Sequence, residues 1–170
     1  MGNRGGRIHR EWRITRHHAS ARWIICRLAF KNRRRTVMSA DSYTELFFLD
    51  EATAFAAGHR PCFECRREAA QAFAAAFAES RGAAPMKADE IDAILKAERR
   101  ARRPLIRRAA LAPGAMVAAA GAAFLYDGAD FHRWSFKGYA PGAPEGPLTL
   151  LTPVSALGAF RAGYRPEMRI

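Results

Sequence analysis

The chain has 170 residues, of which 49% are hydrophobic, and it carries a formal net charge of +12. This length suffices for one compact core, and three cysteines are too few for the disulfide framework of a small secreted domain. No apolar run reaches the roughly twenty residues that span a bilayer, and the first residues lack the apolar segment of a signal peptide. We therefore expect a soluble, cytoplasmic protein without membrane contact, whose positive charge suits a polyanionic partner.

Residues 1–22 are predicted to be a basic arm. Between residues 1 and 35 there are eleven Lys or Arg residues and a single acidic one, Glu11. Trp12 and Trp23 lie among these arginines, a mixture typical of segments that contact phosphates and stack on bases. A solvated basic tail is the simpler alternative, but such a tail has no need of tryptophans. The predicted nucleic-acid contacts in this arm are Arg10, Arg13, Arg16 and Arg22.

Residues 23–30 are rich in β-branched and aromatic residues and are predicted to form a strand. Residues 36–39 are its expected hairpin partner, and residues 43–49 are expected to be a third strand. The turn at residues 31–35 is then a basic hairpin tip, which either lies along a phosphate backbone or protects a sheet edge. The predicted nucleic-acid contacts of this hairpin are Arg27, Arg33, Arg34 and Arg35.

The segment that leads to the second and third cysteines has strong local signals. Asp50 is a typical helix N-cap, residues 51–57 favour a short helix, and Gly58 suits the left-handed position that ends it. Cys62 and Cys65 follow with a two-residue gap, a spacing that lets two thiolates bind the same metal ion. A closed structural zinc site needs four ligands, so two more must come from elsewhere in the chain.

Residues 56–66, AAGHRPCFECR, resemble the zinc-binding domain of the Ada family of DNA methyl-phosphotriester repair proteins. That family has a short alanine-rich helix, then Ala-Ala-Gly, an aromatic residue, Arg-Pro-Cys, two residues and Cys-Arg. Its first half has a strand that ends in Cys-Arg-x-x-Cys, which residues 23–30 match at Cys26 and Arg27. Phe30 stands where the family has a further cysteine. The resemblance covers about residues 23–67.

The resemblance implies that zinc is bound by Cys26, Cys62 and Cys65. In the Ada family the cysteine of the strand is both zinc ligand and methyl acceptor, so Cys26 is the implied nucleophile and Arg27 would steer the alkylated phosphate. The change at Phe30 removes one thiolate and would alter the reactivity of the remaining sulfurs. Arg60 and Arg66, which flank the cysteine pair, are further predicted nucleic-acid contacts.

Two histidines compete as the fourth ligand of this site. His59 is nearest in sequence, although the family has an aromatic residue there that packs and does not ligate. His9 lies upstream of Cys26, as do His17 and His18, and a flexible arm can fold back to bring one of them in. His132 lies in a different region and is disfavoured. The alternative is that Cys26 is simply a buried apolar residue and the site is vestigial.

The middle of the chain is predicted to be helical. Residues 64–81 place two phenylalanines one turn apart on an apolar face. Residues 87–103 favour a second helix, with acidic residues in its first turn and arginines at its end. A further helical turn is expected within residues 105–111. Glu98 lies among the arginines, where a solvated ion pair is favoured over a role as general acid, general base or metal ligand.

Residues 113–170 are predicted to be β-rich. Short strands at residues 115–120, 122–126 and 131–136 are separated by turns and predict a meander. After a loop at residues 140–147, residues 148–151 return as a strand. A short terminal helix is expected to follow, with Thr152 as its N-cap and Pro153 as its first residue.

Trp134 and Tyr139 lie close to Lys137 and Arg133 in this region. Such a group can stack on bases and contact phosphates, and Trp134 and Lys137 are therefore predicted contacts. The alternative is that both aromatic residues belong to the core of a small sheet, as is common.

The sequence thus predicts a single α+β domain with an N-terminal β-hairpin and Ada-like zinc knuckle, two central helices, and a C-terminal antiparallel meander closed by a short helix. We expect a zinc-binding protein that binds nucleic acid, with DNA favoured over RNA. The alternatives are stoichiometric alkyl-phosphotriester repair through Cys26 and a metal-dependent nuclease or hydrolase using His59, Glu98 and Asp92. The predicted parts are a basic arm at 1–22, the knuckle region at 23–81, a basic helical region at 87–111 and the β-rich region at 113–170.

Overall fold

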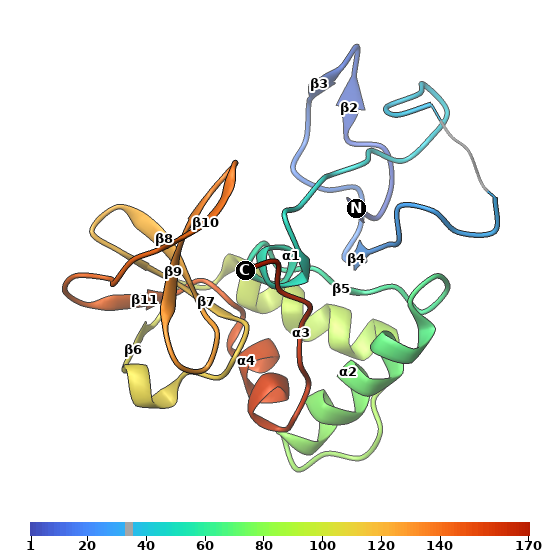
Figure 1. Ribbon diagram of the computed structural model, residues 1–170. Helices are drawn as coiled ribbons and strands as arrows, with labels where there is room; N and C mark the ends of the chain where they lie inside the picture. The colour runs from blue at the N-terminus through green and yellow to red at the C-terminus, as the bar shows by residue number, and fades with distance from the viewer. Residues whose placement is uncertain (33–35) are drawn as a thin grey trace.

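The computed structural model describes residues 1–32 and 36–170 and confirms a mixed α+β fold. Figure 1 shows the N-terminal segment as a loop-rich layer over the helices, with the largest sheet beside them. The helices are α1 (Glu51–Ala56), α2 (Arg67–Glu79), α3 (Ala88–Arg100) and α4 (Val154–Arg161), with a 3-10 turn at Arg108–Ala110. The strands are β1 (Gly2–Arg4), β2 (His9–Arg10), β3 (Arg13–Ile14), β4 (Trp23–Ile25), β5 (Arg60–Pro61), β6 (Leu105–Ile106), β7 (Ala115–Ala119), β8 (Ala122–Tyr126), β9 (Phe131–Ser135), β10 (Gly138–Pro141) and β11 (Leu148–Leu150).

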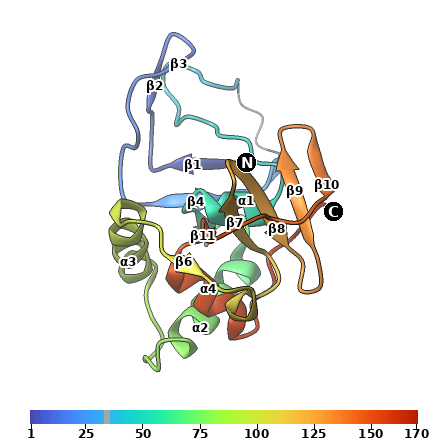
Figure 2. The same ribbon diagram turned by 90° about the vertical axis from the view of Figure 1, so that its left-hand side faces the viewer.

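The N-terminal sheet has the order β1-β4-β5, with β4 antiparallel to β1 and parallel to β5. Figure 2 shows β1 and β4 side by side. The predicted pairing of β4 with residues 36–39 is therefore wrong: both edges of β4 are occupied, and those residues are turn and coil. Residues 43–49 contribute only a single bridge, between Leu46 and Gly2, and are not the predicted strand. The predicted tip residues Arg33, Arg34 and Arg35 lie outside the described residues.

The basic arm is folded onto the molecule. Its first residues form β1, and its middle forms a separate hairpin of β2 and β3. The two residues at the hairpin tip, Glu11 and Trp12, have positive φ angles of 49° and 65°, as a tight two-residue hairpin turn requires. The sequence signal for these strands is weak because each is so short, and a β-pattern cannot be read from two or three residues.

Helix α1 has the predicted N-cap and ends at Ala56, one residue before the predicted end. The Asp50 carboxylate accepts hydrogen bonds from the backbone N–H and the hydroxyl of Thr53, at 2.8 and 2.7 Å. Gly58 has φ +83°, and a Cβ there would lie 2.7 Å from the Arg99 side chain. Glycine is therefore required both by conformation and by the close approach of α3.

Helices α2 and α3 are confirmed in shortened form. Helix α2 begins at Arg67, later than the predicted residue 64, because the cysteine turn occupies the preceding positions. Helix α3 ends at Arg100, and Ala101 is already extended, with ψ 156°. Phe73 and Phe77 of α2 and Ile91 and Leu95 of α3 are buried, as their spacing indicates.

The large sheet is antiparallel, with the order β10-β9-β8-β7-β11-β6. Strands β7, β8 and β9 form the predicted meander, and β10, which was not expected as a strand, extends it. The expected helix within 105–111 is wrong at its start, since β6 pairs with β11 and only the 3-10 turn is helical. Pro153, expected inside α4, is its N-cap. Thr152, expected to be that N-cap, instead accepts a hydrogen bond from the backbone N–H of Met116 at 2.9 Å.

One hydrophobic cluster connects these layers. It contains buried residues from β4, α1, α2, α3, the large sheet and α4, among them Ile25, Phe55, Phe73, Val117 and Phe160. In the part of the chain that the structure describes, no helix is long and apolar enough to cross a membrane. The hydrophobic cluster fixes the N-terminal sheet on the helical layer, and β4 and β5 of this sheet lead directly to Cys26 and Cys62.

Candidate metal centre

Three cysteines from distant parts of the sequence converge at one end of the N-terminal sheet. Cys26 directly follows β4, and Cys62 directly follows β5. Because these strands are parallel, with Ile25 opposite Pro61, their next residues emerge at the same edge. The backbone N–H of Cys62 donates to the carbonyl of Ile25 at 3.0 Å. Cys65 returns to this edge through the turn before α2, and all three sulfurs lie within 4.8 Å of one another.

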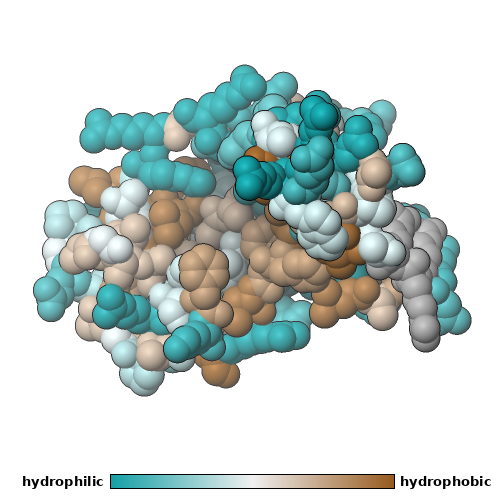
Figure 3. Space-filling model, turned by 90° about the horizontal axis from the view of Figure 1, so that it is seen from above, coloured by the Kyte–Doolittle hydropathy of each residue, from teal (hydrophilic) through white to brown (hydrophobic). Residues whose placement is uncertain are grey.

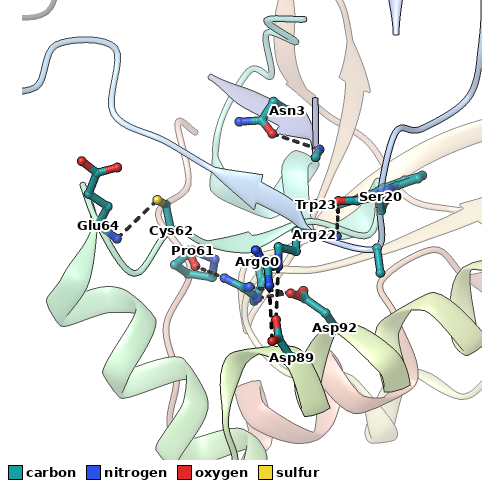
Figure 4. Close-up of polar contacts among 12 residues, drawn as sticks. Asn3, Ser20, Arg22, Trp23, Arg60, Pro61, Cys62, Glu64, Asp89 and Asp92 are labelled. Carbon is teal, nitrogen blue, oxygen red and sulfur yellow. Dashed lines mark hydrogen bonds and ion pairs between the residues drawn. The ribbon is translucent and has the colours of Figure 1, made fainter. Parts of the chain in front are cut away.

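Backbone N–H groups favour the charged form of two of the sulfurs, whereas burial opposes it and raises the pKa of Cys65. The N–H of Arg27 points at Sγ of Cys65, and the N–H of Glu64 points at Sγ of Cys62, both at 3.4 Å. Figure 4 shows the second of these contacts. Hydrogen bonding from Cys26 lowers the pKa of Cys62, and the same interaction raises the pKa of Cys26. Donors that stabilise a charged sulfur promote its ionisation, and the thiolate is the form that binds metals.

The chemistry of this donor set fits a soft or borderline metal ion. Three sulfurs at such mutual distances can bind one ion, and thiolates are preferred by zinc and copper(I) over magnesium or calcium. The cluster lies beside two hollows in the surface, of about 650 and 430 Å³. Cys26 is half-buried, while Cys62 and Cys65 are buried. Phe30, which stands where the Ada pattern has a cysteine, lines both hollows.

His59 is not part of the cysteine cluster. Its side chain is 0% exposed, and its ring lies 4.8 Å from that of Phe48 and 5.2 Å from that of Trp23, measured between centroids. Neither ring nitrogen has a hydrogen-bond partner among the described residues. Burial, reinforced by the positive charge of Arg4, lowers the pKa of His59 to about 3. His59 therefore packs as a neutral aromatic residue outside the group of cysteines to which it was predicted to belong.

The other histidines also lie outside the cluster. Nδ1 of His9, the second predicted ligand, is 2.6 Å from the hydroxyl of Thr44. His17 and His18 pack around Trp23. His132 is paired with Asp127 on the large sheet at 2.6 Å. Among the described residues, the structure brings together the three predicted cysteines and neither of the predicted histidines.

Two of the arginines predicted to contact nucleic acid have acidic partners within the protein. Arg60 forms a bidentate ion pair with Asp92 at 2.9 and 2.6 Å, and the two side chains are only 4% and 3% exposed. Figure 4 shows this pair reaching from β5 to α3. Arg66 pairs with Glu51 at 3.1 Å and is mostly buried. A buried, neutralised guanidinium has neither the access nor the net charge to bind a phosphate.

The remaining described arginines of the prediction are exposed. Arg22 pairs with Asp89 at 3.2 Å, an ion pair in which both side chains remain in contact with solvent (Figure 4). Arg27 lies at the rim of the two hollows. The others belong to the β2–β3 hairpin or follow it: Arg10, Arg13 and Arg16.

A groove of about 720 Å³ runs along this hairpin. Arg10, Trp12 and Arg16 line it, together with Arg7, which sequence reasoning did not single out. The guanidinium of Arg7 donates to the carbonyl of Ala40, across the groove. Trp12 is 70% exposed although it is a large aromatic residue. The groove thus combines several exposed cations with one exposed aromatic face.

The second predicted aromatic surface is mostly structural. Trp134 is half-buried and packs against the cluster of Ala52, Met116 and Leu125, and the hydroxyl of Tyr139 donates to Asp50 at 2.9 Å. Lys137 is exposed in the β9–β10 turn beside Phe136, which is 94% exposed and was not predicted. The sequence alone did not distinguish the buried aromatic residues from the exposed ones, because alternation in a strand does not reveal which face of the sheet is covered.

The acidic residues of the predicted nuclease lie apart from each other, and each has a structural partner. Glu98 accepts hydrogen bonds from the backbone N–H and the hydroxyl of Ser155, at 3.1 and 2.6 Å, and so caps α4 from another helix. Asp92 forms its ion pair with Arg60, and His59 lies between the rings of Trp23 and Phe48, which form an aromatic box around it. The described residues contain no cluster that joins these three side chains.

Figure 3 shows the face seen from above, where hydrophobic residues gather in the middle and hydrophilic residues project along the edge. The exposed apolar residues near the cysteines include Leu28, Val37 and Phe47.

A scan of protein-family models, a search of curated proteins and a search of solved structures each give no match for this chain.

Proposed function

We propose that this chain is a zinc-binding protein that binds nucleic acid, with DNA the favoured partner. The observation that carries the proposal is the exposed Trp12 among exposed arginines on a hairpin whose base is fixed by the sheet that holds the cysteines. Arginines compensate phosphate charge, and an aromatic face stacks on bases of any sequence. The net charge of +12 also favours association with a polyanion such as nucleic acid.

Zinc has a structural role in this proposal. Cys26, Cys62 and Cys65 would hold the ion and join the end of β4 to the end of β5. Strand β1 pairs with β4, and the chain leads from β1 into the β2–β3 hairpin. A bound ion would therefore restrain the platform on which the basic hairpin stands. This supports a binding module in which metal and nucleic acid act at different places on one small sheet.

Equilibrium binding of a short DNA duplex at several salt concentrations tests the proposal. Replacing Arg10 and Arg13 by Ala should weaken binding and reduce the slope of log K against log salt by about 2, since each lost phosphate contact removes about 0.9. The matched control replaces Lys96 and Arg107, which are exposed on α3 and after β6, and should change the slope much less. Equal effects of the two pairs would reject the hairpin as the interface.

Trp12→Ala provides a second, charge-neutral test. Stacking on an aromatic side chain contributes about 1–3 kcal/mol per base, and an exposed residue contributes little to folding. Affinity for single-stranded DNA should fall by about tenfold or more while the melting temperature is unchanged. Unaltered affinity would remove the base-stacking part of the proposal and leave only a basic surface.

Stoichiometric repair through Cys26 is a second candidate. One observation favours it: Cys26 is the half-buried sulfur of the three, and it lies with Arg27 beside both hollows. A repair protein would transfer the methyl group of a DNA phosphotriester to this sulfur, releasing the phosphodiester. Peptide mass spectrometry after incubation with methylated DNA should then find one methyl group on Cys26. An unmodified Cys26 after prolonged incubation would exclude this candidate.

A further inference from the structure

The cysteine cluster offers three ligands, one fewer than a closed zinc site has. Zinc in proteins is usually tetrahedral, and sites with three protein ligands keep the fourth position for water or another small molecule. Among the His, Cys, Asp and Glu residues that the structure describes, only the three cysteines come together. Phe30, four residues after Cys26, offers no ligand atom.

The hollow of about 430 Å³ lies where such a ligand would bind. All three cysteines line it, so a metal at the cluster borders this space directly. Its walls are largely apolar and include Leu28, Phe30, Val37 and Phe47. Walls of this kind disfavour strongly hydrated anions and favour a small organic molecule whose metal-binding atom is soft.

Glu45, a polar residue in the wall, indicates which group the ligand carries at the end away from the metal. Glu45 is 7% exposed and lines the same hollow. Its Oε2 accepts a hydrogen bond from the backbone N–H of Met38 at 2.9 Å, whereas Oε1 is buried without a partner among the described residues. A buried carboxylate oxygen is costly to leave unpaired, so a ligand that carries an N–H donor would be selected over one that does not.

We propose that the three-cysteine metal site binds a small aminothiol in this hollow. The thiol sulfur takes the fourth coordination position and releases its proton to solvent, and the ammonium group lies toward Glu45. The thiol supplies the soft fourth ligand that Phe30 does not. This inference rests on the metal part of the proposed function and is independent of nucleic-acid binding.

The test uses the full chain loaded with cobalt(II), whose visible absorption bands report the number and kind of ligands. Cysteamine and propanethiol are titrated as probes, because they have similar sizes but only cysteamine carries an ammonium group. In the wild-type protein both thiols should shift the bands to a saturating end point, with cysteamine binding about tenfold more tightly. Glu45→Gln should reduce this preference, since the amide lacks the negative charge.

Phe30→Cys and Phe30→Leu form the matched pair of variants. Phe30→Cys supplies a fourth thiolate from the protein, so its bands should resemble the thiol-saturated wild type and no longer respond to either probe. Phe30→Leu keeps an apolar wall without a ligand atom and should respond like the wild type. The metal content of each sample is measured by mass spectrometry under native conditions before and after titration.

The outcomes separate this inference from the proposed function. Wild-type protein that binds cobalt but shows no spectral response to thiols would overturn the open position while leaving the metal site intact. Bands that disappear together with the metal would overturn it as well, because the thiol would then compete for the ion. Failure to bind any cobalt would overturn both the inference and the metal part of the proposed function.

Discussion

His59 gives the clearest prediction about how the N-terminal layer is built. The ring is fully buried between Trp23 and Phe48, and no described residue accepts or donates a hydrogen bond to it. Replacing it by Phe removes two unpaired polar atoms and keeps an aromatic ring in the box. We expect His59→Phe to retain the metal and to be less sensitive to acid than the wild type.

The size of the effect follows from the pKa of His59, which is lowered from 6.5 to about 3. Below pH 6.5 the unfolded state binds a proton that the folded state does not bind until about pH 3, so stability falls as the pH decreases through this range. Each pH unit removes about 1.4 kcal/mol, which amounts to about 2 kcal/mol at pH 5. The variant lacks this contribution.

Urea unfolding of both proteins between pH 7 and pH 4.5 measures this difference. The comparison uses the change in the free energy of unfolding between the two pH values. A packing cost of the larger Phe side chain lowers this free energy equally at both pH values, so it cancels. His59→Leu, which is closer to His in volume, serves as a second variant. Parallel stability profiles for wild type and variants would show that His59 is solvated or hydrogen-bonded in the folded protein. Loss of metal at pH 7 in the variants would show that His59 is a ligand.

Three further changes test the packing around the site. Asp92→Leu leaves Arg60 buried without a counter-ion and should cost about 3–5 kcal/mol in urea unfolding, whereas combining it with Arg60→Met should recover most of this loss. Glu98→Ala removes the cap of α4 and should lower stability by about 1–2 kcal/mol, with weaker amide protection in the first turn of that helix. Gly58→Ala places a Cβ against Arg99 at positive φ and should cost about 1–2 kcal/mol, measured as a lower melting temperature. A loss below about 0.5 kcal/mol in any of these would contradict the contact concerned.

Local signals in the sequence were sufficient for the knuckle. The cap at Asp50, the left-handed Gly58 and the spacing of Cys62 and Cys65 depend only on neighbouring residues, and each is present in the structure. Cys26 was assigned to the same site through the resemblance of residues 23–30 to the Ada family. The convergence itself depends on the parallel pairing of β4 with β5, which has no local sequence signal.

Long-range pairings account for the failed predictions. Residues 36–39 were expected beside β4, but β1 occupies that edge, and a strand of three residues is too short to recognise from its pattern. Arginine is usually an exposed residue, so Arg60 was expected at the surface. It is buried because it pairs with Asp92, thirty-two positions later in the sequence. Thr152 has the residue type of an N-cap, yet Glu98 supplies the cap from a different helix. In each case a distant partner decided the outcome.

Metal content of the purified, reduced protein, measured by mass spectrometry under native conditions, tests the central claim most directly. We predict one zinc ion per chain, lost in Cys26→Ser, Cys62→Ser and Cys65→Ser and retained in His9→Ala and His59→Phe. Retention in the histidine variants with loss in the cysteine variants would establish the three-sulfur site. Metal-free wild-type protein after supply of zinc, or zinc that persists in the cysteine variants, would contradict the account.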